Sequence, residues 1–194
     1  MQFDAGLSSF CAVILAGGRA ARLGGADKAS MEVDGRTLLA HALDAVIDAA
    51  EVVVVGESVP TERPVTFALE SPRYGGPAAA LLTGRDALLR TTPRLAVLAV
   101  DMPHLQADTF RRLLAASADG DGAVLTDPSG RRQLALVVDT ARLDAVRPGL
   151  EDQHDLPLHR LLAELDLAEV PSTGAEHRDV DTWEDLRDVR SSTP

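Results

Sequence analysis

A continuous apolar run at residues 11–16, CAVILA, leads directly into the glycine pair Gly17-Gly18. An uninterrupted apolar run of this length is typical of a strand that is buried on both faces of a sheet. Glycines that follow such a strand predict a tight turn at its carboxyl end. This segment therefore favours a parallel sheet covered by helices, with a glycine-rich loop at the edge where ligands bind in such sheets.

The rest of the chain alternates between strand and helix patterns. Apolar and β-branched runs predict strands, and apolar residues at helical spacing predict helices. The expected strands are 51–55, 65–69, 94–100, 122–126, 133–139, 167–170 and 177–180. The expected helices are 37–49 (burying Leu39, Leu43, Val46 and Ile47), 77–90, 106–117, 156–165 and one that begins at Asp181 or Thr182. This order is typical of βαβ units, so we expect a three-layer α/β/α architecture with a mainly parallel, Rossmann-like sheet.

Length and charge limit what such a chain can do. Its 194 residues suffice for one core and contain no linker-like segment, so we expect a single domain over 1–194 with flexible ends at 1–9 and 190–194. The formal net charge of −11 argues against nucleic-acid or membrane partners. The lone cysteine excludes an internal disulfide, and the chain shows neither a signal peptide nor a spanning segment, so we expect a cytoplasmic protein.

Three cations lie in the loop that follows the first strand: Arg19, Arg22 and Lys28, in a chain with only 19 Lys and Arg. Glycine-loop N–H groups can approach an anion closely, and neighbouring cations add charge-assisted hydrogen bonds, so the loop is predicted to bind phosphate. Asp27 and Ala29, on either side of the lysine, exclude a P-loop, and adjacent glycines exclude the dinucleotide fingerprint. The alternative is a glycine-rich surface turn with solvated arginines.

Four motifs, in order, resemble those of the MobA-like nucleotidyltransferase family. Residues 15–28 match Leu-Ala-Gly-Gly-x-x-x-Arg-x-Gly-Gly-x-Asp-Lys, and residues 100–103 match its strand-end Asp-Met-Pro. Residues 179–186 are similar to its C-terminal Asn/Asp-Thr-Pro-Glu-Asp-Leu, with Trp183 in the proline's place. Residues 74–81 are similar to its second loop, but Ala79-Ala80 departs from the usual Gly-Pro-Leu-Ala-Gly. The resemblance implies the nucleotide-diphospho-sugar transferase type of fold.

The resemblance also implies site residues. Catalysis is expected to use Arg19, Lys28 and Asp101, and Mg²⁺ is expected at Asp101 and Asp181. The expected nucleotide contacts are Leu15, Ala16, Gly17, Gly18, Arg22, Lys28, Glu70, Gly76, Pro77 and Asp101. From the residues alone, Asp101 could equally cap a turn, and Asp181 could cap a helix with Glu184 in a capping box. Glu70, where the family more often has aspartate, could accept from the guanine edge or be a solvated acid.

The implied reaction is transfer of GMP from GTP to a molybdopterin-type phosphate acceptor, with release of pyrophosphate. Two alternatives stay open: a transferase of the same fold that uses CTP or another phosphate acceptor, and a non-catalytic nucleotide-binding or partner-docking protein. Transient docking to molybdenum cofactor enzymes is also left open. Arg131 and Arg132, on a predicted turn, could contact an anionic acceptor, although solvated turn arginines are commoner. The five histidines are scattered, so no zinc site is expected.

Overall fold

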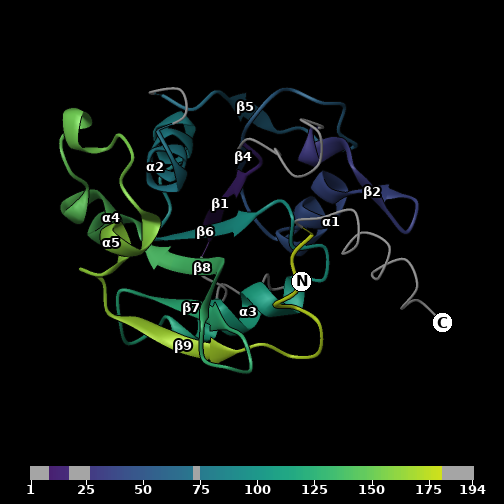
Figure 1. Cartoon of the computed structure of the whole chain (residues 1–194). Helices are drawn as coiled ribbons and strands as arrows, with labels where there is room; N and C mark the ends of the chain where they lie inside the picture. Colours follow the sequence, from purple (N-terminus) through teal and green to yellow (C-terminus); the bar gives the residue numbers. More distant parts are fainter. Residues whose placement is uncertain (1–8, 18–26, 72–74, 181–194) are drawn as a thin grey trace, which may run out of the picture.

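The computed structural model describes residues 9–17, 27–71 and 75–180, and its centre is a seven-stranded sheet in the order β5-β4-β1-β6-β8-β7-β9 (Figure 1). Only β8 runs antiparallel to its neighbours in this sheet, and every other pairing is parallel. The strands are β1 (Phe10–Leu15), β4 (Val52–Val55), β5 (Thr66–Ala68), β6 (Arg94–Ala99), β7 (Gly122–Thr126), β8 (Arg132–Asp139) and β9 (Leu167–Pro171). The predicted mainly parallel α/β sheet is confirmed.

Helices cover both faces of this sheet, and each face has its own apolar core (Figure 1). Successive strand residues point to opposite faces, so Ala12 and Ile14 of β1 join one core and Val13 joins the other. The first core is covered by α1 (Leu38–Ala45) and α3 (Ala107–Ala116). The second is covered by α2 (Pro77–Ala87), α4 (Thr140–Val146) and α5 (Leu158–Leu162). The expected three layers are therefore present.

Four short elements complete the described chain. The 3-10 helices are η2 (Lys28–Ser30) and η3 (Leu150–Asp152), and the strands β2 (Glu32–Val33) and β3 (Arg36–Thr37) form a separate hairpin. Asp34 and Gly35 turn this hairpin with φ values of 52° and 74°, which is the positive-φ pair that a tight two-residue turn requires. Among the described residues, no helix has the length and apolar character needed to cross a membrane.

Some element predictions were wrong. Residues 177–180 form no strand. Val180 donates its N–H to the Asp101 carbonyl (2.8 Å), but this is an isolated hydrogen bond and not part of a β-ladder. Helix α1 ends at Ala45, so the helical spacing no longer applies to Ile47, whose side chain is 51% exposed. Helix α4 was not predicted, although the Asp139 carboxylate caps it by accepting the Arg142 N–H.

Helix α2 lies unusually close to the sheet at Gly84. A Cβ at this position would lie 2.4 Å from Val13 Cγ1 and 2.9 Å from Val55 Cγ2. Both valines are fully buried on β1 and β4. Because glycine has no side chain, the helix backbone can rest directly on these two strands.

The segment after β9, residues 172–180, is fixed to α3 by a buried carboxylate, and we name this segment the strap. Arg112 Nη2 lies 2.6 Å from both Glu176 carboxylate oxygens, Thr109 donates its hydroxyl to the same group, and the Thr173 N–H donates at 2.6 Å. Glu176 is only 8% exposed. The clamp holds the strap in place, and Val180 at its end contacts Asp101.

Glu176 should make the stability of the protein depend on pH. Burial acts to raise the pKa of its carboxyl, but hydrogen bonds from Arg112, Thr109 and Thr173 outweigh burial, so the pKa lies below the ordinary 4.5. A depressed folded pKa gives stability that is complete above the unfolded pKa and is lost as pH falls through the folded one. Glu176→Gln should therefore lower the unfolding free energy at pH 7 by about 2 kcal/mol.

Urea unfolding between pH 7 and pH 3 would measure this effect. The wild type should lose stability below about pH 4.5 more steeply than Glu176→Gln, which lacks the titrating group. Asp108→Asn is the control, since its carboxylate also faces Arg112 but is 72% exposed. Parallel pH profiles for wild type and Glu176→Gln would contradict the assignment.

Candidate functional site

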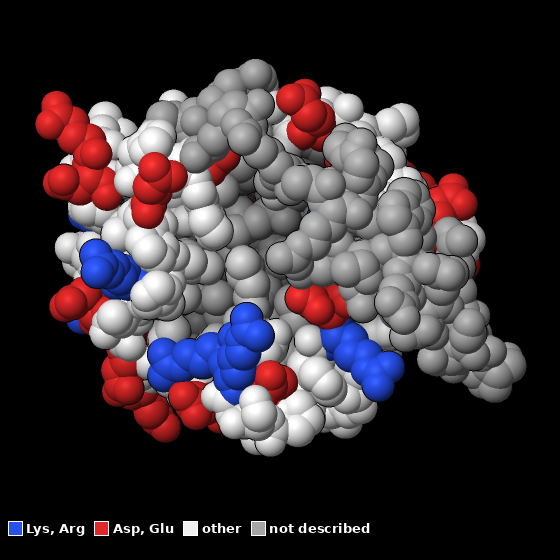
Figure 2. Space-filling model, viewed as in Figure 1, with Lys and Arg blue, Asp and Glu red and all other residues white. Residues whose placement is uncertain are grey.

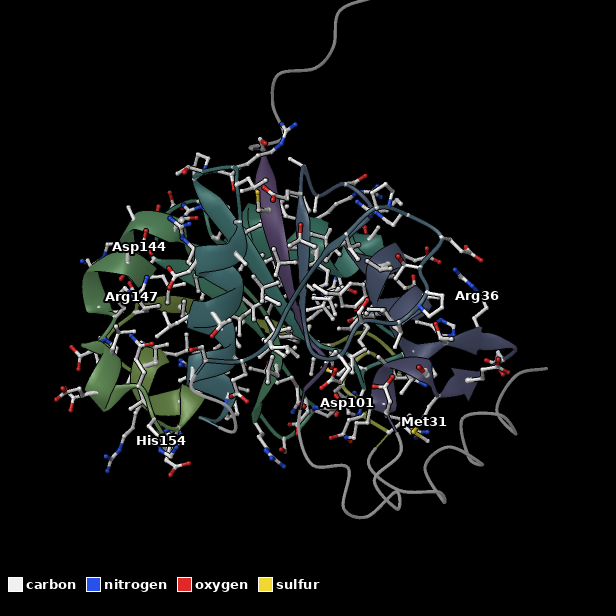
Figure 3. All side chains as sticks on the ribbon, turned by 90° about the horizontal axis from the view of Figure 1, so that it is seen from above. Met31, Arg36, Asp101, Asp144, Arg147 and His154 are labelled. Atoms are coloured by element: carbon white, nitrogen blue, oxygen red, sulfur yellow. The ribbon has the colours of Figure 1, made fainter. Side chains whose placement is uncertain are left out.

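The carboxyl ends of the parallel strands meet at one edge of the sheet and bring distant motifs together. Ala16 donates its N–H to the Val55 carbonyl (2.9 Å), and Val100 donates to the Leu15 carbonyl (3.0 Å). The start of the glycine loop therefore lies between the ends of β4 and β6, and Asp101 lies two residues after the end of β6. Figure 3 shows Asp101 and Met31 at this edge, near the lower side of the view.

An ion pair joins two of the predicted site residues. Lys28 Nζ lies 2.8 Å from Asp101 Oδ2, although 73 residues separate them in the chain. Asp27 sets the position of Lys28 by capping η2, since it accepts the Ala29 N–H (3.2 Å) and the Ser30 hydroxyl (2.7 Å). The Lys28 and Asp101 side chains are 18% and 21% exposed, so the pair is partly shielded yet open to a ligand.

The second loop begins helix α2 on the same side of the sheet. Gly76 is the N-cap with φ of 92°, a conformation that favours glycine, and Pro77 is the first helical residue. A hydrogen bond from another segment fixes this loop, because Asp155 donates its N–H to the Gly75 carbonyl (2.8 Å). N–H groups at the start of such a helix can bind an anion.

Glu70 follows β5 at the same edge and is partly exposed. The next residue, Ser71, donates its N–H to the Thr83 hydroxyl of α2 (3.1 Å). The segment carrying Glu70 is therefore attached to the helix that begins at Gly76 and Pro77. This attachment fixes Glu70 relative to the second loop.

The structure describes eight of the predicted site residues: Leu15, Ala16, Gly17, Lys28, Glu70, Gly76, Pro77 and Asp101. Leu15 and Ala16 are each only 8% exposed, so their backbone rather than their side chains faces any nucleotide. Gly18, Arg19, Arg22 and Asp181 lie outside the described residues, and their roles stay predictions.

Gly56 belongs to this edge and was not predicted. A Cβ there would lie 3.1 Å from the Ala16 carbonyl carbon and 3.3 Å from the Gly17 nitrogen. Any larger residue at this position would therefore press on the start of the glycine loop. The available signal was a glycine placed directly after the apolar run 52–55, the same pattern that marked Gly17.

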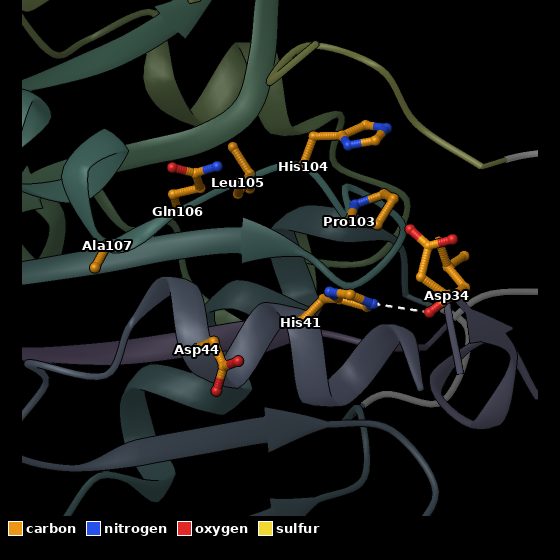
Figure 4. A pocket seen from close by; sticks show the side chains of 9 residues that line it. Asp34, His41, Asp44, Pro103, His104, Leu105, Gln106 and Ala107 are labelled. Carbon is orange, nitrogen blue, oxygen red and sulfur yellow. Dashed lines mark hydrogen bonds between the residues drawn. The ribbon is translucent and has the colours of Figure 1, made fainter. Parts of the chain in front are cut away.

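A cavity of about 300 Å³ lies between helix α1, the turn of the β2–β3 hairpin and residues 103–107 (Figure 4). His41 contacts the Val33 carbonyl through Nε2 (3.0 Å), and His104 lies across the cavity. Burial lowers the pKa of His104, and the charges of Arg178 and His41 lower it further. The structure thus brings together two of the five histidines that are scattered along the sequence. The described part of the chain nevertheless holds no group of three His, Cys, Asp or Glu able to bind a metal.

This sheet edge is that of a nucleotidyltransferase fold, and comparison with known families agrees. Residues 12–170 match the MobA-like NTP transferase domain, so the chain belongs to this family. It is 33% identical over 126 residues to molybdenum cofactor guanylyltransferase of Bradyrhizobium sp. (strain ORS 278), which covers 61% of this chain and 59% of that protein. It is 31% identical over 150 residues to the Mesorhizobium japonicum protein of the same name, covering 73% and 72%. The match thus spans less than two thirds of the Bradyrhizobium protein.

Solved structures share the fold at low identity. Rv0371c from Mycobacterium tuberculosis H37Rv aligns with a TM-score of 0.77 at 19% identity, covering 96% of this chain and all of that one. The same protein in complex with manganese aligns with a TM-score of 0.73 at 16% identity, with the same coverage. Molybdopterin-guanine dinucleotide biosynthesis protein A from Archaeoglobus fulgidus gives 0.70 at 16%, covering 93% and 96%.

Proposed function

We propose that this chain is a nucleotidyltransferase that transfers GMP from GTP to the phosphate of a molybdopterin-type acceptor. The observation that carries the proposal is the Lys28–Asp101 ion pair, which stands beside the start of a glycine loop at the carboxyl edge of the sheet. This arrangement offers one cation for phosphate and one carboxylate for a metal. The names of the relatives supply the choice of GTP and of the acceptor.

The proposed reaction is an in-line displacement at the α-phosphorus of GTP. An oxygen of the acceptor phosphate forms the new P–O bond, and the bond to the β-phosphate oxygen breaks, so pyrophosphate leaves with that electron pair. The acceptor phosphate is already ionised near neutral pH, and no side chain needs to remove a proton. Positioning and charge neutralisation therefore carry the catalysis.

Lys28 would stabilise the charge that develops on the leaving pyrophosphate. Its present partner, the Asp101 carboxylate, holds the ammonium at the mouth of the site before any nucleotide arrives. The N–H of Gly17 would bind phosphate, and Glu70 would accept hydrogen bonds from the guanine edge. Arg19 and Arg22 are proposed to add positive charge to the same loop.

The residues at this edge fit a magnesium ion. Asp101 offers a partly exposed carboxylate, the oxygen ligand that Mg²⁺ prefers, and Mg²⁺ at nucleotide sites needs only one or two carboxylates besides phosphates and waters. Asp181 is proposed as the second, because it follows Val180, which contacts the Asp101 backbone. When bound, the ion would neutralise charge on the phosphate oxygens.

A cytidylyltransferase is the second candidate, because 4-diphosphocytidyl-2C-methyl-D-erythritol synthase from Anaerococcus prevotii shares the fold. The two structures align with a TM-score of 0.71 at 14% identity, covering 95% of this chain and 97% of that one. The unusual second-loop residues do not favour it over GTP transfer. Ala79 and Ala80 are buried, 0% and 8% exposed, and Ala80 belongs to the core between α2 and the sheet, so neither methyl group is free to face a base. A cytoplasmic location and docking to molybdenum cofactor enzymes stay predictions from the sequence.

Calorimetric titration of GTP, CTP and ATP with Mg²⁺ tests the proposal. GTP should bind at least about tenfold more tightly than CTP, since a carboxylate that accepts from the guanine edge finds no matching donor pair on cytosine. Glu70→Gln should reduce this preference, whereas Glu62→Gln, an exposed carboxylate on the loop that leads to β5, serves as the control. Preference for CTP would move the chain to the cytidylyl alternative, and binding of no nucleotide would contradict the site.

A further inference from the structure

Most of the arginines that the structure describes form ion pairs with carboxylates. Eight of the described arginines form ion pairs with Asp or Glu: Arg36, Arg85, Arg94, Arg111, Arg112, Arg132, Arg142 and Arg147. Arg63 donates instead to the carbonyls of Leu43 and Val46. Within the described part of the chain, the guanidinium groups of four others make no ion pair or hydrogen bond: Arg90, Arg131, Arg160 and Arg178. All four side chains are exposed.

Two of these four arginines lie at the edge that carries Asp101. The β6–β8 ladder is last paired at Leu98 and Ala135, and β8 extends beyond this pair to Arg132, alongside the segment that leads to Asp101. Arg131 immediately precedes β8, so it lies at this edge of the sheet. Arg178 lies in the strap, two residues before Val180, whose N–H contacts the Asp101 carbonyl.

The turn that carries Arg131 uses its own acid internally. The Asp127 carboxylate accepts hydrogen bonds from the Ser129 N–H (2.8 Å), the Ser129 hydroxyl (2.6 Å), the Arg131 N–H (3.0 Å) and the Gln133 amide (3.3 Å). The Ser129 hydroxyl is the main reason why the pKa of Asp127 is lowered. Asp127 therefore fixes the turn through its own hydrogen bonds, and no carboxylate in the described residues forms an ion pair with the Arg131 side chain.

The strap meets this turn, so Arg131 and Arg178 approach the site from two segments. Ser172 donates its N–H to the Thr126 carbonyl at the end of β7 (2.8 Å), and His177 contacts the Ser172 hydroxyl (3.2 Å). His177 is close enough to Asp127 for its charge to contribute to lowering the pKa of that carboxyl. Figure 2, which looks onto this edge, shows Lys and Arg side chains in two groups on the lower half of the face.

We propose that Arg131 and Arg178 bind the phosphate monoester of the acceptor, on the side of Asp101 away from the glycine loop. The inference rests on the proposed function and names the substrate group that Arg131 and Arg178 would bind. In-line displacement requires the attacking oxygen and the leaving pyrophosphate to lie on opposite sides of the α-phosphorus. The sheet order provides such sides, because β1 with its glycine loop flanks β6 on one side, and β8 and β7 flank it on the other. Two guanidinium groups match a phosphate dianion.

The test is titration of inorganic phosphate into the full chain, alone and saturated with Mg²⁺–GTP. Arg131→Gln and Arg178→Gln should each weaken phosphate binding about threefold to tenfold, and the double variant should weaken it further, since charge-assisted contacts at an exposed site are partly screened. Arg131→Lys should retain most of the affinity because it keeps the charge. Mg²⁺–GTP affinity should stay unchanged in every variant.

Arg90→Gln and Arg160→Gln are the matched controls. They remove the same unpaired charge at the amino end of β6 and on α5, and should leave phosphate binding unchanged. Three outcomes would each overturn the proposal. The control variants could lose as much phosphate affinity as the Arg131 and Arg178 variants, or the double variant could keep wild-type phosphate affinity. Alternatively, saturating GTP could abolish phosphate binding. If the chain fails to bind GTP while phosphate still depends on Arg131 and Arg178, the proposed function fails and the anion site stands.

Discussion

Asp101→Asn is expected to lower kcat/KM for nucleotidyl transfer about a thousandfold, because the amide removes a negative charge where a metal and a developing phosphate charge must be balanced. The same change removes the negative charge that lies 2.8 Å from the Lys28 ammonium. Pyrophosphate release, measured with GTP and a molybdopterin acceptor over a range of Mg²⁺ concentrations, would report the loss. The fold should hold, since the Asp101 side chain is 21% exposed.

The matched control for Asp101→Asn is Asp144→Asn. Asp144 pairs with Arg85 at the same distance, 2.8 Å, between α4 and α2 and away from the sheet edge. Its replacement should leave kcat/KM within about twofold of wild type, because the pair lies away from the reacting groups. If Asp101→Asn kept activity within tenfold of wild type, Asp101 would be a structural partner of Lys28 rather than a catalytic group.

Gly84→Ala should have the largest effect on stability, lowering the free energy of unfolding by about 3 kcal/mol. The added methyl would lie 2.4 Å from Val13 Cγ1, and β-branched valines on buried strands cannot turn aside. Either α2 must lift from the sheet or β1 must shift. Urea unfolding at pH 7 would measure the change.

Gly149→Ala serves as the control for this substitution. Gly149 has a negative φ of −57°, and the nearest atom to an added Cβ is 4.0 Å away. This variant should be as stable as the wild type or slightly more so, because alanine reduces the freedom of the unfolded chain. Equal stability of Gly84→Ala and Gly149→Ala would show that α2 can move away from the sheet without cost.

Patterns that depend on one segment were predictable from the sequence. The run before Gly17 predicted β1, and Asp101 after its own apolar run predicted a polar residue at the sheet edge, because parallel strands end on the same side. The proximity of Lys28 and Asp101 was expected only through the family resemblance. The spacing of Lys28 and Asp101 in the sequence does not show that the chain between them brings both residues to the same edge of the sheet.

Features that depend on packing between segments were not predictable. Residues 177–180 have the β-branched and charged character of a short strand, yet the Glu176 clamp holds the strap on α3 instead. His41 and His104 share one cavity because α1 and the segment before α3 converge, which no spacing of histidines could show. Ion pairing also distinguishes the neighbours Arg131 and Arg132. Arg132 pairs with Glu169, whereas Arg131 pairs with no carboxylate of the described residues.

The contact at Gly84 has a consequence for how a nucleotide would be received. Helix α2 begins at the second loop, and the two strands on which it rests end beside the glycine loop. Because α2 has no clearance at Gly84, it cannot move independently of β1 and β4, and the backbone at Gly17 and at Gly76 therefore belongs to one stiff unit. A ligand that contacts both of these glycines would find them already at a fixed separation, so its binding would cost little conformational entropy at these two points.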